Sequence, residues 1–407
     1  MKKNKKIGII TPHFWPENFV INDIANYIAQ LGNDITVITG QPNYPGGEIY
    51  KGYEKIKKLK IYRFKNIKIL RFPIIPRKKG STYNLILNYL SFILNGKFYL
   101  KNFLKNNKFD HILVYGVTPI TTAILGIFIK KKIKSRLSIW VQDLWPENIK
   151  VSGHIKNKFF LYLISLIVKY IYKNSDNIIA QSNSFKKNLK FYTKKKIYVV
   201  ENCSFNNKFI YKKIPNKVQK ILNKFSCFTF AGNIGSAQSV ETIIECAKKL
   251  QFNNKIFFLI IGQGSHLKKM KNLCKKYNLN NVCFFGPYNI HVIYQILKKS
   301  SGQILTLKKD STLSLYIPQK FTMYLAVKKP IIISADGETL KMTKKFKVGY
   351  VGSAENVNAL CKNIIKVERL NNKKLNKIKK NCSKLFEQKF MLKKQSKKLL
   401  EIINNSQ

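Results

Sequence analysis

Acidic residues are scarce in this sequence. The 407 residues include 19 Asp and Glu against 75 Lys and Arg, which gives a formal net charge of +56. Nucleic acid and anionic lipid surfaces are the partners that such a charge suits. The lysines are spread over the whole length on the polar faces of amphipathic segments, and no RGG tract, zinc finger or basic arm occurs. We therefore interpret an anionic membrane surface as the better partner and nucleic acid as unlikely, with part of the charge reflecting compositional bias.

Metal-binding and disulfide patterns are also absent. The seven cysteines form no CxxC pair, and the five histidines have no ligand spacing. This favours a reduced cytosolic protein without structural zinc. No apolar run is long: Ile7–Ile10 is too short for the apolar region of a signal peptide, and Phe159–Tyr172 contains Lys169 and is too short to span a bilayer.

What is present is an alternation of strands and helices. Ile7–Ile10 reads as a buried strand, a helical pattern carries Ile21, Ile24 and Ile28, and Ile35–Thr39 is the next strand. This βαβ unit implies a parallel sheet. Further strands are expected in the first half at 61–64, 67–72, 111–115, 137–141, 177–181 and 197–200, and in the second half at 225–231, 256–261, 282–285, 303–307, 331–334 and 348–351.

The length and this repeated plan predict two doubly wound, Rossmann-like α/β domains that face each other across a cleft. We expect an amino-terminal domain at 1–200, a polar linker at 201–217 and a carboxy-terminal domain at 218–390. A last helix within 391–407 is expected to pack back on the first domain. Ligands in such sheets bind at the carboxyl ends of the strands.

The stretch 229–238, Thr-Phe-Ala-Gly-Asn-Ile-Gly-Ser-Ala-Gln, opens the second half. It runs from a strand through a turn with Gly232 and Gly235 into a helical pattern. A glycine turn before a helix offers backbone N–H groups to an anion, and the absence of side chains permits close approach. We expect phosphate binding here, although plain tight turns use the same residues.

Two helical stretches combine apolar residues with lysine. Tyr83–Leu104 is interrupted only by Gly96, and Phe159–Tyr172 is the most apolar helix candidate. Such faces suit a membrane interface. A core helix with lysines on its wet side explains the first pattern equally well.

Five motifs in order resemble the retaining GT-B glycosyltransferases of family 4, and within them the bacterial polysaccharide enzymes similar to fucosamine and colanic-acid transferases. The motifs are TVITGQPNYP at 36–45, WVQDLWPE at 140–147, AGNIGSAQ at 231–238, IGQG at 261–264 and IPQK at 317–320. The resemblance covers nearly the whole chain. It implies a nucleotide-sugar donor on the second domain and an acceptor on the first.

The resemblance implies that Gly232 and Asn233 lie at the donor diphosphate. Gly235, Gln238 and Gly262 are further donor-binding candidates. Many members carry Arg and Lys where this chain has Asn233 and Gln238, so the usual cationic clamp is missing. Lys320, which follows Pro318 and begins a helix, is the best replacement and a catalytic candidate. The alternative is that Lys320 is one of the many solvated lysines and has no role in the site.

The family's paired glutamates are absent as well. Leu315 and Met323 stand at their positions, so the ribose contact is unassigned. Glu338, which follows Asp336-Gly337 at a strand end, is the nearest carboxylate that could take this role. An ordinary acid at the start of a helix is the alternative.

Acids near strand ends in the first half are candidates for acceptor chemistry. Asp143 could position or deprotonate the acceptor, and Glu17 is a second candidate. His13, Asn43 and Glu147 are expected on the acceptor side. The alternatives are a helix cap for the acids at 143 and 147, and a loop histidine with satisfied hydrogen bonds at 13.

The predicted function is transfer, with retention, of a sugar from a UDP- or GDP-sugar to a lipid-linked saccharide at the cytoplasmic face of the membrane, in surface polysaccharide assembly. No cofactor and no metal are expected, because no DxD pair stands at a strand end and lysine can meet the phosphate charge. A nucleotide-sugar epimerase on the same architecture would carry acid–histidine pairs, which the sequence does not reveal. A non-catalytic basic nucleic-acid-binding protein is the rival from another class. The sequence leaves the oligomeric state open.

Overall fold

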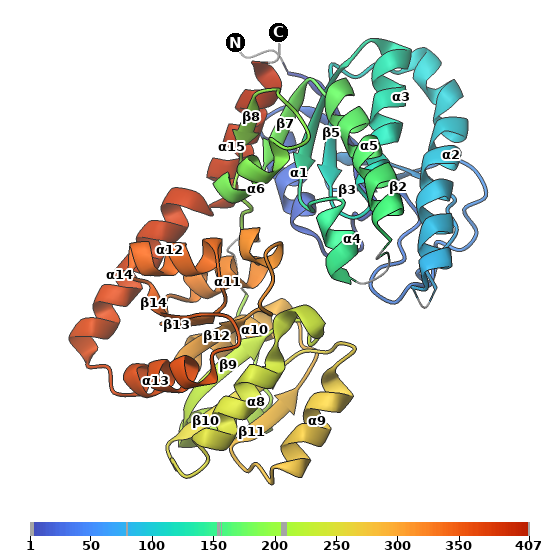
Figure 1. Ribbon diagram of the computed structural model, residues 1–407. Coiled ribbons are helices and arrows are strands. Elements are labelled where there is room, and N and C mark those ends of the chain that lie inside the picture. Colours follow the sequence, from blue (N-terminus) through green and yellow to red (C-terminus); the bar gives the residue numbers. More distant parts are fainter. Residues whose placement is uncertain (1–3, 79, 153–154, 156, 205–209, 406–407) are drawn as a thin grey trace. The chain divides into compact units, whose positions relative to one another are not determined.

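The computed structural model describes residues 4–78, 80–152, 155, 157–204 and 210–405 (Figure 1). The chain divides into an amino-terminal unit, 1–201 together with 392–407, and a carboxy-terminal unit, 202–391. The expected linker at 201–217 is assigned to the second unit from Asn202 onward, and its residues 205–209 lie outside the described residues. Each unit contains one sheet with helices on both faces, as the alternating pattern predicts.

The sheet of the amino-terminal unit has the strand order β3-β4-β2-β1-β5-β6-β7-β8. Its strands are β1 (Lys6–Ile10), β2 (Asp34–Gly40), β3 (Lys60–Phe64), β4 (Ile67–Phe72), β5 (His111–Gly116), β6 (Arg136–Val141), β7 (Asn177–Ala180) and β8 (Ile197–Val199). The helices are α1 (Val20–Gln30), α2 (Thr82–Asn106), η1 (Ile120–Thr122), α3 (Ala123–Ile133), α4 (Glu147–Ser152), α5 (Lys158–Asn174), α6 (Asn183–Leu189) and α15 (Leu392–Asn404).

One edge of this sheet departs from the expected parallel arrangement. β3 pairs with β4 in the antiparallel direction, whereas the other neighbours in the sheet are parallel. Only Lys65 and Asn66 join the two strands, and Lys65 has φ of +54°. A connection this short permits a hairpin and excludes a parallel crossover.

The sheet of the carboxy-terminal unit is entirely parallel, in the order β11-β10-β9-β12-β13-β14. Its strands are β9 (Ser226–Ala231), β10 (Ile256–Ile261), β11 (Val282–Phe285), β12 (Gly302–Thr306), β13 (Ile331–Ser334) and β14 (Gly349–Gly352). The helices are α7 (Asn216–Lys224), η2 (Ser236–Gln238), α8 (Val240–Lys249), α9 (Leu267–Lys276), α10 (Ile290–Lys299), η3 (Leu313–Leu315), α11 (Gln319–Val327), α12 (Glu338–Phe346), α13 (Val357–Glu368) and α14 (Asn372–Lys389).

Gly96 does not interrupt the long helix α2, contrary to the expectation of a break. A Cβ atom at this position would lie 2.6 Å from Cδ2 of Leu125 on α3. The glycine therefore allows α2 and α3 to pack closely. Its helix-weakening effect is about 1 kcal/mol, which the packing of a 25-residue helix overrides.

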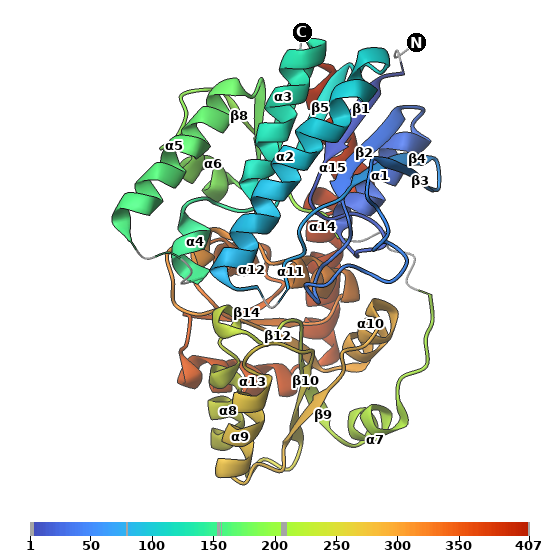
Figure 2. The ribbon, with the colours of Figure 1, turned by 90° about the vertical axis from the view of Figure 1, so that its right-hand side faces the viewer.

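Helices α2, α3 and α5 are neighbours on one face of the amino-terminal sheet (Figures 1 and 2). Helix α15 packs against α1 in the same unit. Among the described residues, no helix is long and apolar enough to cross a membrane.

Candidate active site

The donor side of the predicted site lies where β9 ends. The first turn of α11 faces this strand end, because Lys320 and Tyr324 are one helical turn apart on the same side. The Tyr324 hydroxyl accepts a hydrogen bond from Ala231 N at 3.0 Å and donates to Ile304 O at 3.3 Å. This buried tyrosine fixes α11 against β9 and β12.

The ammonium of Lys320 is buried at this place and has no hydrogen-bond partner in the structure. The residue is partly accessible as a whole, but its Nζ atom is not. Nζ lies 3.9 Å from the ring centroid of Phe230. Burial lowers the pKa of Lys320 to about 7, since no carboxylate compensates for the lost hydration. The alternative of a solvated lysine is therefore wrong.

Gly232 provides the space for this ammonium. A Cβ atom on Gly232, which has φ of +149°, would lie 3.1 Å from Lys320 Nζ. Glycine is required at position 262 for a different reason. A Cβ atom there would lie 1.9 Å from the carbonyl oxygen of Gly232. Gly262 thus lets the loop after β10 support the loop after β9. A direct contact with the donor is not needed to explain it.

Asn233 and Gln238 hold the glycine loop closed. The Gln238 Oε1 atom accepts hydrogen bonds from Asn233 Nδ2 and Gly235 N, both at 3.2 Å. Neither side chain brings a charge, so the two amides that replace the family's cations stabilise the loop instead. Lys320 brings a cation to this loop from α11.

Glu338 and Met323 leave the ribose contact open. Glu338 begins α12 after Gly337, which has φ of +75° and whose Cβ would collide with the carbonyl of Ser314. Met323 on α11 is partly buried and packs against the hydrophobic core of this unit. The role of Glu338 toward the ribose stays a prediction.

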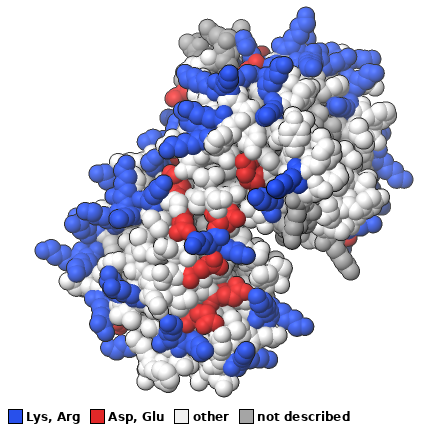
Figure 3. All heavy atoms as spheres, in the orientation of Figure 1, with Lys and Arg blue, Asp and Glu red and all other residues white. Residues whose placement is uncertain are grey.

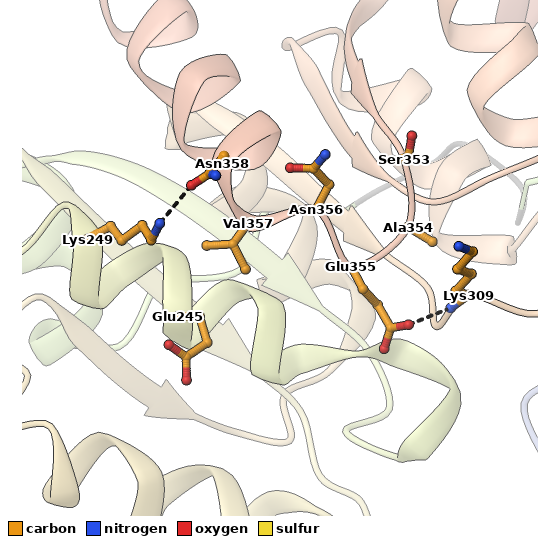
Figure 4. A pocket seen from close by; sticks show the side chains of 9 residues that line it. All are labelled: Glu245, Lys249, Lys309, Ser353, Ala354, Glu355, Asn356, Val357 and Asn358. Atoms are coloured by element: carbon orange, nitrogen blue, oxygen red, sulfur yellow. Dashed lines mark hydrogen bonds between the residues drawn. The ribbon is translucent and has the colours of Figure 1, made fainter.

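A separate open pocket is formed by the loops after β12 and β14 together with α8 (Figure 4). Glu355 accepts hydrogen bonds from Lys309 N at 3.0 Å and Ser239 Oγ at 3.2 Å, and so joins the loops that follow β9, β12 and β14. Figure 3 shows acidic residues gathered in a band on this unit, amid a surface dotted with lysine. The pocket contains none of the predicted site residues and its carboxylates do not suit a diphosphate.

The acceptor side of the predicted site includes a buried cluster around Glu17. Its Oε1 atom accepts from Asn43 N at 3.0 Å and Tyr44 N at 2.7 Å, and its Oε2 atom accepts from Phe14 N at 3.2 Å. The His13 Nδ1 atom lies 3.2 Å from Glu17 Oε1. Glu17 therefore joins the loops after β1 and β2, which gives it a positioning role in the structure.

His13 is held on two sides. Its ring stacks on Phe19 at 4.9 Å and lies 5.0 Å from the ring of Tyr44. The His13–Glu17 pair corrects one inference from the sequence, in which no acid–histidine pair was recognised. The four-residue spacing within a loop gave no helical reason to pair them, and the contact depends on the fold of that loop.

Arg71 is a buried cation that sequence reasoning missed. Its guanidinium donates hydrogen bonds to Gly40 O, Phe14 O and Trp15 O, and lies 5.2 Å from the ring centroid of Tyr53. Burial lowers its pKa to about 10, while the charge of Glu17 opposes the shift. Arg71 therefore stays charged at neutral pH and fixes the loop after β1 to the last residue of β2.

Asp143 lies at the end of β6 and its carboxylate is fully engaged. Oδ2 accepts from Thr118 N at 2.7 Å and Thr118 Oγ1 at 2.8 Å, and Oδ1 accepts from Asn148 Nδ2 at 3.1 Å. Burial raises the pKa of Asp143, and these bonds and the nearby His13 partly offset the rise. The carboxylate is thus a stronger base than a solvated one.

Glu147 points elsewhere. Its Oε1 atom accepts from Asn188 Nδ2 at 3.1 Å and from Tyr192 OH at 2.9 Å, which joins α4 to the segment around α6. Burial raises the pKa of Tyr172 and of Tyr192, and the charge of Glu147 adds to both shifts. The structure therefore separates Glu147 from Asp143, although the motif at 140–147 contains both.

Two further polar groups belong to the acceptor side. Arg77 hydrogen-bonds to Tyr89, and its guanidinium lies 5.6 Å from the ring centroid of Tyr44. Asn43 donates to Gln41 O at 2.9 Å, while its buried Oδ1 atom has no partner. The composition could have drawn attention to Arg71 and Arg77, because arginine is rare beside lysine in this chain. The arginines are Arg63, Arg71, Arg77, Arg136 and Arg369.

Two family models match the two halves of the chain. Residues 18–203 match glycosyltransferase family 4, and residues 212–385 match glycosyl transferases group 1. This chain is a GT-B glycosyltransferase of family 4. The resemblance to GT-B glycosyltransferases of family 4 is confirmed, and so is the prediction of two Rossmann-like domains.

Individual relatives of this glycosyltransferase are distant. The putative colanic acid biosynthesis glycosyl transferase WcaI of Escherichia coli K12 is 23% identical over 333 residues, which cover 78% of this chain and 79% of the relative. An uncharacterized glycosyltransferase of Methanocaldococcus jannaschii is 26% identical and covers 77% of each chain. The sucrose-phosphate synthase structure from Thermosynechococcus elongatus has a TM-score of 0.72 at 15% identity, with 98% of each chain covered. The alternative of a non-catalytic nucleic-acid-binding protein is wrong.

Proposed function

We propose that this glycosyltransferase moves a sugar, with retention, from a UDP- or GDP-sugar to a lipid-linked saccharide at the cytoplasmic face of the membrane, in surface polysaccharide assembly. The single observation that carries the donor assignment is the buried, unpartnered ammonium of Lys320 beside Gly232. A buried cation without a partner is costly, so a bound anion is what would justify it. The resemblance to family 4 supports retention, and the similarity to the putative colanic acid transferase WcaI supports a role in polysaccharide assembly.

In the proposed reaction the bond between the sugar C1 and the diphosphate oxygen breaks, and its electron pair stays with the diphosphate. Lys320 and the N-terminus of α11 stabilise the negative charge that develops there. A new bond forms between C1 and the acceptor oxygen. The products are a nucleoside diphosphate and the glycosylated acceptor.

Asp143 receives the proton of the acceptor hydroxyl in this proposal. Its raised pKa makes it a better proton acceptor than a solvated carboxylate. Glu17 acts through His13, whose ring it orients, and Arg71 holds the loop that carries both residues. His13 and Asn43 then offer polar groups to the acceptor saccharide.

Thermal unfolding with nucleoside diphosphates tests the donor assignment. A ligand that binds only the folded state stabilises it by about 2.7 kcal/mol at a hundredfold excess over its Kd. UDP or GDP should raise Tm by several degrees, and Lys320→Met should reduce this increase. An unchanged Tm with both nucleotides would contradict the proposal.

The His13–Glu17 pair is the kind of acid–histidine pair that the epimerase alternative requires. An activity assay must therefore distinguish a transferase from an epimerase. The transferase releases nucleoside diphosphate only when an acceptor saccharide is present. An epimerase-like enzyme cleaves or rearranges the nucleotide sugar without an acceptor. Acceptor-independent nucleotide release at the full rate would favour the alternative.

A further inference from the structure

Helix α5 is largely uncovered although it is one of the most apolar helices of the chain. Among its 17 residues, all of them described, only Val168, Ile171 and Tyr172 are buried. Its large apolar side chains Phe159, Phe160, Tyr162, Leu163, Leu166, Ile167 and Tyr170 are between 38% and 63% exposed. So much exposed apolar surface on one element indicates an interaction site.

Helix α2 exposes a second apolar stripe. Ile86, Leu90, Leu94 and Phe98 follow each other at intervals of four residues and are between 46% and 73% exposed. Lys101 and Lys105 continue the same stripe toward the end of the helix. The opposite face of α2 is buried, so the stripe points away from the core.

The two stripes lie on the same side of the amino-terminal sheet. Helices α2 and α5 both pack against α3 and η1. Figures 1 and 2 agree that the three helices cover one face of this sheet. The space-filling view is mostly white over α2 and α5, with lysines around the margin (Figure 3). We call the exposed side chains of α2 and α5 named above the α2–α5 face.

Charge identifies the occupant of this face. Helices α2, α3 and α5 contain no Asp or Glu. They contribute the lysines Lys97, Lys101, Lys105, Lys130, Lys131, Lys132, Lys158, Lys169 and Lys173. An apolar surface surrounded by cations fits a bilayer with anionic headgroups, because rings and aliphatic chains enter the interface while ammonium groups meet the phosphates.

We infer that the α2–α5 face is the surface by which this unit docks on an anionic lipid bilayer, with α5 lying along the interface. A second copy of the chain fits less well, since its own lysines would face these lysines without a compensating acid. Docking through this face does not depend on the proposed function. Only its role, which is to bring the enzyme to a lipid-linked acceptor, rests on that function.

Helix α2 also connects this face to the acceptor site. Tyr89 lies next to Leu90 in the sequence, and its ring centroid is 6.3 Å from that of Trp145. Tyr89 also hydrogen-bonds to Arg77. Burial raises the pKa of Tyr89, and the charge of the nearby Asp143 adds to the rise. A saccharide attached to a lipid in the docked bilayer would therefore approach the acceptor site along α2.

Flotation with vesicles tests the docking surface directly. The wild-type protein should float with vesicles of phosphatidylcholine and phosphatidylglycerol and much less with phosphatidylcholine alone. Tyr162→Glu/Leu166→Glu on α5 and Leu94→Glu/Phe98→Glu on α2 should each weaken binding at least roughly tenfold. The control is Phe252→Glu, which changes an 87% exposed ring in the other unit and should float like wild type.

The variants change exposed residues, so their Tm and their nucleotide-stimulated Tm increase should match the wild type. Turnover should fall with a lipid-linked acceptor in vesicles and stay unchanged with a short water-soluble acceptor. Flotation does not require catalysis, so this experiment tests the docking surface even if the proposed function is wrong. Variants that still float, or equal binding to both vesicle types, would overturn the inference. A wild-type dimer that these substitutions convert to monomers without loss of flotation would also overturn it.

Discussion

The Nζ atom of Lys320 lies 3.1 Å from the position that a Cβ atom on Gly232 would occupy. Lys320 lies in the first turn of α11, and Gly232 directly follows β9, 88 positions earlier in the chain. The missing side chain at Gly232 and the buried ammonium are therefore two parts of one feature. An anion bound at the glycine loop would meet both.

The first prediction concerns this pair. Gly232→Ala forces the Lys320 side chain to move and places alanine at φ of +149°, a cost of about 1–3 kcal/mol. It should weaken nucleoside diphosphate binding strongly in the wild type and much less in Lys320→Met. A double-mutant cycle measured by calorimetric titration checks this. Strictly additive effects would show that the two residues do not share a ligand.

The second prediction is proton-linked donor binding. Burial lowers the pKa of free Lys320 to about 7, and a bound diphosphate should raise it, because the opposite charge favours the ammonium. Binding should therefore take up protons near and above pH 7, and affinity should fall as the pH rises through this range. Titrations in buffers of different ionisation enthalpy measure the uptake. Lys320→Met should show no such uptake from this site.

Stability should depend on pH through the same residue. The unfolded state binds the lysine proton up to about pH 10.4, whereas the folded state loses it near 7, so this group makes folding more favourable as the pH rises between the two values. Lys320→Met removes the penalty of the buried charge. We expect the variant to gain most in Tm below pH 7. A larger gain at pH 9 than at pH 6 would contradict the assignment.

The third prediction concerns Arg71. Arg71→Lys keeps the charge but cannot reach three carbonyl oxygens with one ammonium, and each buried carbonyl left unpaired costs about 1–3 kcal/mol. Urea denaturation should show lower stability, and the KM for the acceptor should rise. Nucleoside diphosphate affinity should stay near wild type, since Arg71 belongs to the other unit. An equal loss of nucleotide affinity would refute this division of roles.

The fourth prediction is metal independence. Lys320 and the α11 N-terminus are proposed to meet the diphosphate charge, which removes the need for a divalent cation at that position. Turnover should persist in EDTA and rise little with Mg²⁺ or Mn²⁺. Activity that disappears in EDTA and returns with either ion would show that the donor site works differently.

Much of the fold could be predicted from the sequence, because buried parallel strands are short apolar runs and their order along the chain follows the βαβ rule. The antiparallel direction of β3 was missed, although the sequence leaves only Lys65 and Asn66 between the two strands, and a connection this short excludes a parallel crossover. The continuity of α2 across Gly96 depends on its contact with Leu125, which is distant in sequence.

The candidate site was predicted less completely, for a similar reason. Motif positions located Lys320, but its burial without a partner depends on Phe230 and on the loop at Gly232. Asp143 and Glu147 stand four residues apart, yet Glu147 begins α4 and turns toward Asn188. Arg71 lies on a strand, and only the fold brings to it the carbonyl oxygens of the loop after β1 and of Gly40 at the end of β2.

The central claim is that Lys320 stabilises the departing diphosphate, and the turnover rate of Lys320→Ala tests it most directly. Loss of one preorganised donor of this kind typically lowers the rate about a hundredfold to a thousandfold, or roughly 2.7–4 kcal/mol. The matched control is Lys308→Ala in the loop after β12, which should be mild. We predict a fall of this size in kcat for Lys320→Ala, with a smaller loss of nucleoside diphosphate affinity. Near wild-type turnover in Lys320→Ala, together with a collapse in Lys308→Ala, would contradict the account.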